Sequence, residues 1–198
     1  MNQPIPDPAP AKDRLRATLI AARRQRSGAD RAAAARANAA HLRTLLAGAR
    51  TVCGYLPLDS EPLRTDLLDH LVAAGCAVLV PVIAPDAPLD WCSYPSPSAP
   101  GAFGIAEPVG PRLGPGAASS ADAVLVPALA VDRTGARLGR GGGHYDRTLA
   151  LLSDHHRDRE LVAVLFDGEL LDVVPTGAHD RAVTSAVQPT GGIHRFRS

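Results

Sequence analysis

A glycine-rich stretch near the middle of the chain constrains its fold and function more than any other feature. Four of the five residues 139–143 are glycine, and Arg137 and Arg140 lie beside or within the run. The apolar run 123–126 precedes it and predicts a buried strand, and residues 144–153 have helical spacing. In a strand, glycine-rich loop and helix arrangement, backbone N–H groups and a helix N-terminus converge on an anion. The stretch therefore predicts a site for nucleotide phosphates.

The residue types in this stretch suit phosphate and a divalent cation. Glycine lets the backbone approach a ligand closely, and arginine offers forked donors to phosphate oxygens. Asp146, in the first turn of the predicted helix, is placed to hold a cation that bridges phosphates. The stretch is neither a Walker A motif nor a Rossmann fingerprint, because Gly-Lys-Ser/Thr is missing and His144 replaces a small residue. On composition alone, a surface loop without a ligand remains the alternative.

The complete string from Asp132 to Arg147 carries more information than its composition. It reads Asp-x-x-Gly-x-Arg-Leu-Gly-Arg-Gly-Gly-Gly-x-Tyr-Asp-Arg and closely resembles the signature of the 5-formyltetrahydrofolate cyclo-ligase (5,10-methenyltetrahydrofolate synthetase) family. Shorter motifs extend the resemblance from Lys12 to about Val187. The resemblance implies an ATP-dependent ligase that forms a C–N bond in a reduced folate.

Length and composition are compatible with this family. The 198 residues suit one α/β domain at 12–190, with a disordered, proline-rich tail at 1–11 and a mobile tail at 191–198. No run approaches the roughly 18 apolar residues of a transmembrane helix, and the N-terminus lacks the order of a signal peptide. Three cysteines without metal-ligand spacing give no reason to expect a structural zinc. We therefore expect a cytoplasmic protein without a membrane partner.

The net charge of +1 is unevenly distributed. Residues 12–50 hold ten basic and two acidic residues, a balance of +8, so the remainder carries about −7. A basic first quarter favours an anionic ligand such as ATP or a glutamylated substrate, although a solvated helical surface would look the same. Without interleaved aromatic residues or a binding motif, a nucleic-acid partner is not expected. We expect small-molecule partners, a reduced folate and ATP, and a monomer or weak dimer.

Alternating apolar runs and helical patterns predict a three-layer α/β fold. Its open, mostly parallel sheet should carry helices on both faces and gather ligands at the carboxyl ends of the strands. The predicted strands are 51–56, 77–83, 89–94 (at an edge), 123–126, 161–166 and 182–187. Three predicted helices span 12–26, 29–47 and 144–153. A further helix is predicted to be capped by Asp59 or Ser60 and to end at Gly75. Residues 95–121 are rich in Pro, Gly and Ser and predict a loop.

The predicted nucleotide contacts lie at the N-terminus and in the glycine-rich stretch. Lys12 is the chain's only lysine, against 20 arginines; taken alone it is an ordinary surface lysine near a helix start. Residues 12–16 match a Lys-x-x-Leu-Arg pattern with which the family opens and which contributes to ATP binding. The resemblance thus implies ATP contacts at Lys12, Asp13, Arg14, Leu15, Arg16, Arg137, Leu138, Gly139, Arg140, Gly141, Gly142, Gly143, His144 and Tyr145.

Folate contacts follow from two further motifs. Tyr55, Glu61 and Thr65 fit a Tyr/Phe-x5-Glu-x3-Thr arrangement in which the glutamate contacts folate, although alone Glu61 is an ordinary first-turn acid. Phe103 lies in a segment that resembles Phe-Gly-Ile-x-Glu-Pro; its ring either packs on the substrate or anchors the loop to the core. The implied substrate contacts are Tyr55, Leu56, Glu61, Phe103, Arg140, Gly143, His144 and Tyr145.

The resemblance also implies a magnesium site and marks two departures. Asp146 and Asp180 are the expected metal ligands, the latter in the family's Val-Pro…His-Asp element. His144 stands where relatives usually have Tyr or Phe, and Thr184 where they usually have aspartate. Adjacent His155 and His156 point apart and are expected in solvent.

The implied reaction needs little covalent chemistry from the protein. ATP phosphorylates the formyl oxygen, N10 attacks the activated carbon, and phosphate leaves. Arg140 and Tyr145 are the expected catalytic residues, and positioning and charge neutralisation should dominate. Two alternatives remain: a related α/β enzyme such as a sugar-phosphate isomerase, which would need no ATP, and a nucleotide- or folate-binding regulator without turnover.

Overall fold

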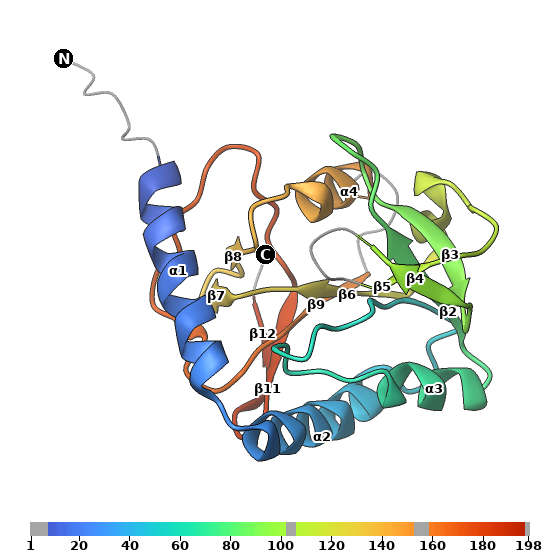
Figure 1. Cartoon of the computed structure of the whole chain (residues 1–198), viewed down its shortest axis with the longest axis horizontal. Helices are drawn as coiled ribbons and strands as arrows, with labels where there is room; N and C mark the ends of the chain where they lie inside the picture. Colours follow the sequence, from blue (N-terminus) through green and yellow to red (C-terminus); the bar gives the residue numbers. More distant parts are fainter. Residues whose placement is uncertain (1–7, 102–105, 153–158, 197–198) are drawn as a thin grey trace.

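A seven-stranded sheet forms the centre of the molecule in a computed structural model that describes residues 8–101, 106–152 and 159–196 (Figure 1). Its strands are β1 (Thr51–Cys53), β2 (Ala77–Val82), β3 (Asp90–Tyr94), β6 (Ala123–Pro127), β9 (Glu160–Val164), β11 (Ser185–Gln188) and β12 (Gly192–Arg195). Their order is β12-β11-β9-β6-β1-β2-β3. The five inner strands pair in parallel, and the edge strands β3 and β12 pair antiparallel. The predicted mostly parallel sheet, with residues 89–94 at an edge, is confirmed.

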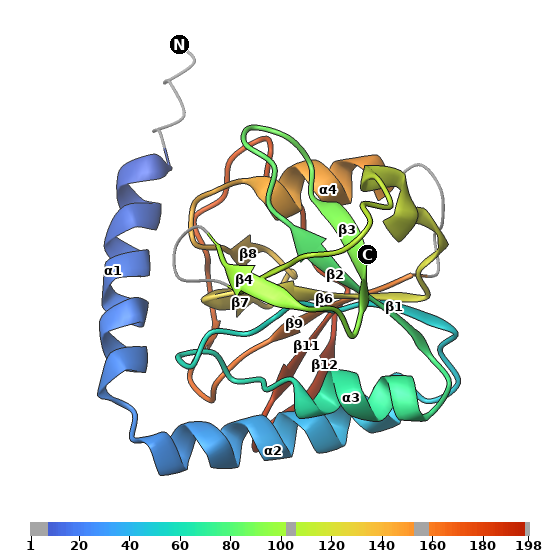
Figure 2. The ribbon, with the colours of Figure 1, turned by 45° about the vertical axis from the view of Figure 1, so that its right-hand side comes forward.

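Helices cover both faces of this sheet, as the sequence predicts (Figure 2). One face carries α2 (Gly28–Leu45) and α3 (Asp66–Ala73); the other carries α4 (His144–Leu152) and the 3-10 helix η2 (Pro115–Ser120). Successive strand residues alternate between the two cores. Val124 and Val126 pack with α4, whereas Leu125 packs with α2 and α3. The strands are therefore continuous apolar runs, because both faces are buried.

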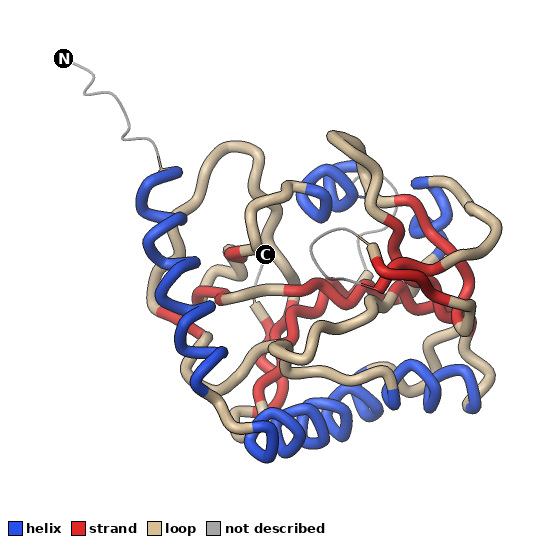
Figure 3. Tube along the Cα trace, in the orientation of Figure 1, coloured by secondary structure: helices blue, strands red, loops and turns tan. Residues whose placement is uncertain are grey.

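A smaller sheet and the first helix build one end of the molecule (Figure 3). The sheet consists of β7 (Ala130–Asp132), β8 (Arg137–Leu138) and β10 (Leu170–Leu171), and α1 (Ala9–Gln25) packs against it. A buried ion pair fixes α1 there. Arg23 Nε and Nη2 each lie 2.7 Å from a carboxylate oxygen of Glu169, and Nη2 also donates to Ala128 O. A buried, bidentate pair with further hydrogen bonds resists the displacement of either element.

Several predicted boundaries are wrong. The first helix starts at Ala9, not Lys12, because Pro10 suits a first turn. The third helix starts at Asp66 rather than after Asp59 or Ser60. Its predicted first turn is a loop, held by the Asn38 amide that donates to Pro62 O at 2.9 Å. Residues 95–121 contain a short antiparallel hairpin, β4 (Ser98–Pro100) and β5 (Ala106–Pro108), besides η2.

The C-terminal prediction is also wrong in part. The last parallel strand begins at Ser185, not at residue 182, and a mobile tail from Gly191 does not follow. Residues 192–195 instead form β12, which pairs antiparallel with β11. The pairing covers the N–H and C=O groups that β11 would otherwise leave exposed at an edge. Within the described part of the chain, no helix is both long and apolar enough to cross a membrane.

Asp132, the first residue of the signature string, organises the turn that leads into the glycine-rich loop. Its Oδ1 accepts hydrogen bonds from Thr134 N, Thr134 Oγ1 and Ala136 N at 2.8, 2.6 and 3.2 Å, and its Oδ2 accepts from Val174 N at 3.0 Å. Burial opposes ionisation of this carboxyl, but these donors outweigh burial and lower its pKa. A side chain at Gly135, where φ is +85°, would lie 2.4 Å from Val183 O. The string thus encodes a structural turn besides the predicted ligand site.

Replacing Asp132 by asparagine is expected to lower the free energy of unfolding by about 2 kcal/mol at pH 7, because hydrogen bonds to a charged acceptor are lost. Because the pKa of Asp132 is lower in the folded state, its ionisation stabilises the fold at pH values above the unfolded-state pKa of about 4. That contribution is lost as the pH falls toward the folded-state pKa, so the difference between variant and wild type should shrink there. Urea unfolding over this pH range measures it. Asp172→Asn, at an 85% exposed side chain, is the control, and a difference that grows below pH 4 would contradict the assignment.

Candidate active site

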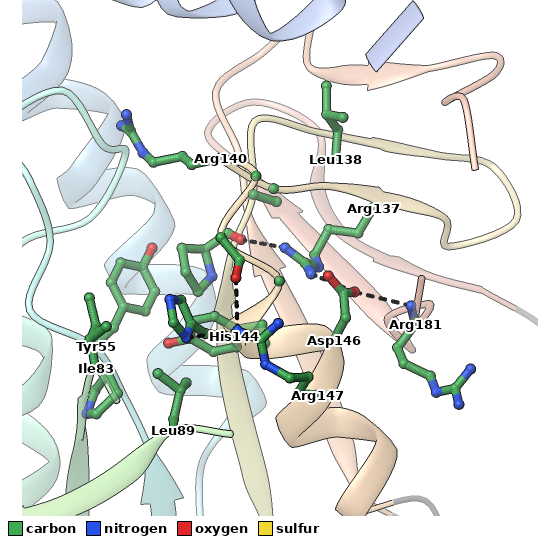
Figure 4. A pocket seen from close by; sticks show the side chains of 18 of the residues that line it. Tyr55, Ile83, Leu89, Arg137, Leu138, Arg140, His144, Asp146, Arg147 and Arg181 are labelled. Atoms are coloured by element: carbon green, nitrogen blue, oxygen red, sulfur yellow. Dashed lines mark hydrogen bonds and ion pairs between the residues drawn. The ribbon is translucent and has the colours of Figure 1, made fainter. Parts of the chain in front are cut away.

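A cavity of about 800 Å³ lies where the inner parallel strands end, beside the glycine-rich loop (Figure 4). Tyr55 and Leu56 follow β1, Ile83 follows β2, and Ala128 follows β6; all four line the cavity. This volume is typical of sites for small molecules and cofactors. The position is where an open α/β sheet gathers its ligands.

Most of the predicted site residues line this one cavity. They are Lys12, Arg16, Tyr55, Leu56, Glu61, Arg137, Leu138, Gly139, Arg140, Gly141, Gly142, Gly143, His144, Tyr145, Asp146 and Asp180. Asp13 and Arg14 lie on an exposed face of α1 outside the lining. Leu15 packs in the small core beneath α1 instead. Phe103 lies outside the described residues, so the prediction of a ring over the substrate stays a prediction.

Close side chains and positive φ angles restrict which residues the glycine-rich loop can accommodate. A Cβ atom at Gly139 would lie 2.6 Å from Arg137 Nη1, and Gly141 has φ of +107°. Arg16 Nε donates to Gly139 O at 3.0 Å and ties α1 to the loop. The residues that the sequence connects to phosphate binding therefore meet at one wall of the cavity, although 123 positions separate Arg16 from Gly139.

Arg137 lies under the loop with unused donor capacity. It is 5% exposed; Nη2 donates to Asp146 Oδ1 at 2.9 Å and Nη1 to Pro127 O at 3.2 Å. Its Nε is buried without a hydrogen-bond partner among the residues that the structure describes. A buried unsatisfied donor carries a free-energy cost, which an anionic ligand would relieve.

Arg140 reaches the opposite way, to the loop before α3. Its Nε lies 3.5 Å from Glu61 Oε1, and its Nη2 donates to Ser60 Oγ at 3.3 Å. Glu61 is buried and also accepts from Leu58 N at 2.9 Å. The 37% exposed Arg140 side chain therefore links the predicted phosphate loop to the predicted folate residue.

The two predicted metal ligands are held by cations. Lys12 Nζ lies 2.5 Å from Asp180 Oδ2, and Gly177 N donates to the same oxygen at 2.6 Å. Burial opposes ionisation of Asp180, but these contacts outweigh it and lower its pKa. Asp146 accepts from Arg137 and, at 3.2 Å, from Arg181 N, in both cases at Oδ1. Asp180 is thus kept as a carboxylate, and Asp146 is ion-paired with Arg137.

These two acids match the open kind of site that magnesium prefers, rather than a site whose ligands all come from the protein. Within the described ranges, no group of three or more His, Cys, Asp and Glu side chains is arranged to hold a metal ion. Magnesium commonly uses one or two carboxylates and completes its octahedron with water and substrate phosphates. Asp146 and Asp180, both in the cavity wall, fit such an ion.

Two buried phenol groups, those of Tyr55 and Tyr145, line the cavity. The hydroxyl of Tyr145 is buried without a hydrogen-bond partner among the described residues, and burial raises its pKa far above the usual value. Tyr55 is 4% exposed, and burial followed by the nearby Glu61 raises its pKa as well. Both hydroxyls therefore stay protonated at neutral pH, and Tyr145 is available as a hydrogen-bond donor to a ligand.

Sequence reasoning missed several residues in the lining, notably Arg147, Arg181 and Glu107. Arg147 Nε donates to Ala87 O at 3.1 Å and Nη2 to Gly142 O at 2.9 Å. In the sequence, two of these residues could have been noticed only from the family motifs: Arg147 is the last residue of the signature string, and Glu107 is the glutamate of the segment that resembles Phe-Gly-Ile-x-Glu-Pro.

The two departures from the family pattern fall in different places. His144 lines the cavity, with Nδ1 3.1 Å from Arg147 Nη2. Thr184 lies outside the lining and accepts from Leu161 N at 2.8 Å, between two strands. The substitution at Thr184 therefore leaves the cavity wall unchanged, and only His144 changes it.

Fold and cavity together define the class: an α/β protein with one composite site, in which a glycine-rich loop and cations face an apolar wall. Comparison with known proteins identifies the family. The chain belongs to the 5-formyltetrahydrofolate cyclo-ligase family, ligases that form a C–N bond, whose sequence profile matches residues 8–189. The resemblance in the signature string is thereby confirmed.

Individual relatives agree with this assignment. A 5-formyltetrahydrofolate cyclo-ligase of Mycolicibacterium smegmatis is 44% identical over 195 residues, which cover 94% of this chain and 98% of the relative. That of Escherichia coli K12 is 31% identical over 146 residues, 72% and 79% of the two chains. The structure of 5,10-methenyltetrahydrofolate synthetase from Aquifex aeolicus superimposes with a TM-score of 0.76 at 26% identity, covering 94% of this chain and 93% of that one.

Proposed function

We propose that this protein catalyses the ATP-dependent cyclisation of 5-formyltetrahydrofolate to 5,10-methenyltetrahydrofolate, with ADP and phosphate as the other products. One observation carries the proposal. A single cavity combines an anion-binding loop and its cations with an apolar, aromatic wall, so that two chemically different substrates can meet in it. Family membership supports the same reaction.

The phosphates of ATP would lie against the glycine-rich loop. Lys12, Arg16, Arg137 and Arg140 line that part of the cavity, and backbone N–H groups of residues 139–143 add donors. Asp146 and Asp180 would hold a magnesium ion, which neutralises phosphate charge when bound. Their present partners, Arg137 and Lys12, would then be free to turn toward phosphate oxygens.

The reduced folate would occupy the rest of the cavity. Tyr55 and Leu56 offer an apolar surface for its rings, and Glu61 accepts hydrogen bonds from its N–H groups. The Tyr145 hydroxyl, buried without a partner among the described residues, would donate to the substrate. His144 supplies a flat ring in the place where relatives usually have Tyr or Phe.

The chemistry makes the formyl carbon electrophilic. An N5-formyl group is an amide, so its carbon accepts nucleophiles poorly and its oxygen leaves poorly. Transfer of the γ-phosphoryl group to that oxygen releases ADP. N10 then forms a bond to the carbon, loses its proton, and phosphate leaves. Placing the formyl oxygen in line with the phosphoryl group and neutralising charge are the protein's main contributions, and Arg140 lies between the two sets of residues.

The remaining expectations belong to the same proposal. The partners are the two small molecules, not nucleic acid or a membrane, and the protein works in the cytoplasm as a monomer or weak dimer. Equilibrium sedimentation across a concentration series tests the last point, and a stable higher oligomer would contradict it.

The first test is absorbance in the methenyl-folate band with purified protein, 5-formyltetrahydrofolate and Mg-ATP. We expect the band to grow, and to fail to grow when ATP is omitted or EDTA is added. Growth without ATP would contradict the proposed mechanism. ATP binding without growth would support a regulator that has lost turnover, and the absence of ATP binding would contradict the interpretation of the glycine-rich loop.

A further inference from the structure

Among the residues that the structure describes, one acid in the cavity wall has no cation as an ion-pair partner. Four carboxyl side chains line it, and three are paired: Glu61 with Arg140, Asp146 with Arg137, and Asp180 with Lys12. The fourth, Glu107, makes no ion pair with any residue that the structure describes. Its one hydrogen bond is accepted by Oε1 from Ile83 N at 3.3 Å. A carboxylate in a cavity rich in arginine is thus left without a cation.

Glu107 lies at the apolar part of the cavity. It belongs to β5, which packs beside β2, and its neighbours in the lining include Pro81, Ile83 and Ala106. Figure 4 shows Ile83 and Leu89 on one side, and Asp146 and Arg181 on the other, with His144 between them. The cavity therefore has a charged side for phosphates and a side where an apolar wall carries one acid.

A half-buried carboxylate without an ion-pair partner among the described residues favours a ligand that brings its own N–H donors, because an unpaired charge out of water is costly. The pterin ring of a reduced folate offers such donors. Its 2-amino group and N3–H lie side by side and can bind the two oxygens of one carboxylate. They belong to the pyrimidine ring, whereas N5, which carries the formyl group, belongs to the adjoining ring.

We propose that Glu107 recognises the 2-amino and N3–H edge of the pterin and so points N5 toward the phosphate side of the cavity. The proposal rests on the proposed function and deepens it. It accounts for the absence of an ion pair between Glu107 and the described arginines, since a guanidinium paired with Glu107 would compete with the ring donors. It also gives Glu107 a role in substrate orientation that is separate from that of Glu61, which is already engaged by Leu58 N and Arg140.

Calorimetric binding to the Glu107→Gln variant provides the test, since the amide keeps the size but loses the charge and one acceptor. Affinity for 5-formyltetrahydrofolate should fall about 10- to 100-fold, whereas affinity for Mg-ATP should stay within about twofold. Ser98→Ala, on the exposed strand that pairs with β5, is the control for hairpin integrity. Equal loss of both affinities would contradict the proposal, because it would indicate a general disturbance of the cavity.

A ligand variant identifies the atoms involved. A 5-formyltetrahydrofolate analogue without the 2-amino group should bind wild type about tenfold more weakly. Its further loss of affinity in Glu107→Gln should be smaller than that of the parent compound, because only N3–H then remains to contact Glu107. If the two losses simply multiply, Glu107 does not contact that group and the proposal is wrong. Wild type that fails to bind 5-formyltetrahydrofolate at all would instead overturn the proposed function, so the two failures are distinguishable.

Discussion

Replacement of Arg140 by alanine is expected to lower kcat/KM for cyclisation by about 1,000-fold, since removal of one charge-stabilising donor at a reacting centre typically costs a factor of 10² to 10³ in kcat. Arg140 belongs to the glycine-rich loop, and its side chain contacts Ser60 and Glu61 in the loop before α3. Because its side chain is 37% exposed, the free energy of unfolding should change by less than about 1 kcal/mol.

Steady-state assays of three variants separate this role from simple charge loss. Arg140→Lys keeps a positive charge but not the forked donors, and should recover only part of the activity. Arg133→Ala removes a 79% exposed arginine from the neighbouring turn and should leave activity unchanged. Activity of Arg140→Ala within about tenfold of wild type, in a folded protein, would remove Arg140 from the proposed catalytic residues.

The glycine-rich loop and the sheet could be predicted from sequence because their causes are local. The apolar runs that became β2, β6 and β9 are continuous because both sheet faces are covered, and the φ of +107° at Gly141 favours glycine. The loop that carries Glu61 could not be predicted. Its proline and acidic residues are typical of a helix start. The segment is instead fixed as a loop by a hydrogen bond from Asn38, which lies 24 positions earlier in the chain.

The ion pairs across the site could not be predicted either, because no local sequence pattern distinguishes the residues that form them. Lys12 and Asp180 are 168 positions apart, and each alone resembles a surface charge. The family resemblance placed both at the site, yet it gave no hint that they pair with each other. Glu107 is the opposite case, because what sets it apart is that it has no ion-pair partner among the described residues. Only the structure of the cavity wall shows this.

Arg137→Met is the second variant with a large expected effect, and it acts on stability and activity together. The substitution retains much of the volume but leaves Asp146 without its guanidinium partner. We expect a loss of about 2 kcal/mol in unfolding free energy, less than for a fully buried pair, since Asp146 keeps 22% side-chain exposure. Cyclisation should fall by about 100-fold or more, because a phosphate-facing cation is removed. Urea unfolding and steady-state kinetics measure the two losses.

The rise in Tm caused by nucleotide distinguishes whether Arg137 binds ATP or only stabilises the folded state. A ligand at 100 times its Kd stabilises the native state by about 2.7 kcal/mol, so Mg-ATP should raise the Tm of wild type clearly. Arg137→Met, Asp146→Asn restores neutrality at the pair and should recover part of the lost stability. It should not recover the Tm rise with Mg-ATP, because Nε, the donor without a protein partner among the described residues, and the Asp146 carboxylate proposed to hold magnesium are both missing. A double variant that regains the full Tm rise would show that Arg137 only neutralises Asp146.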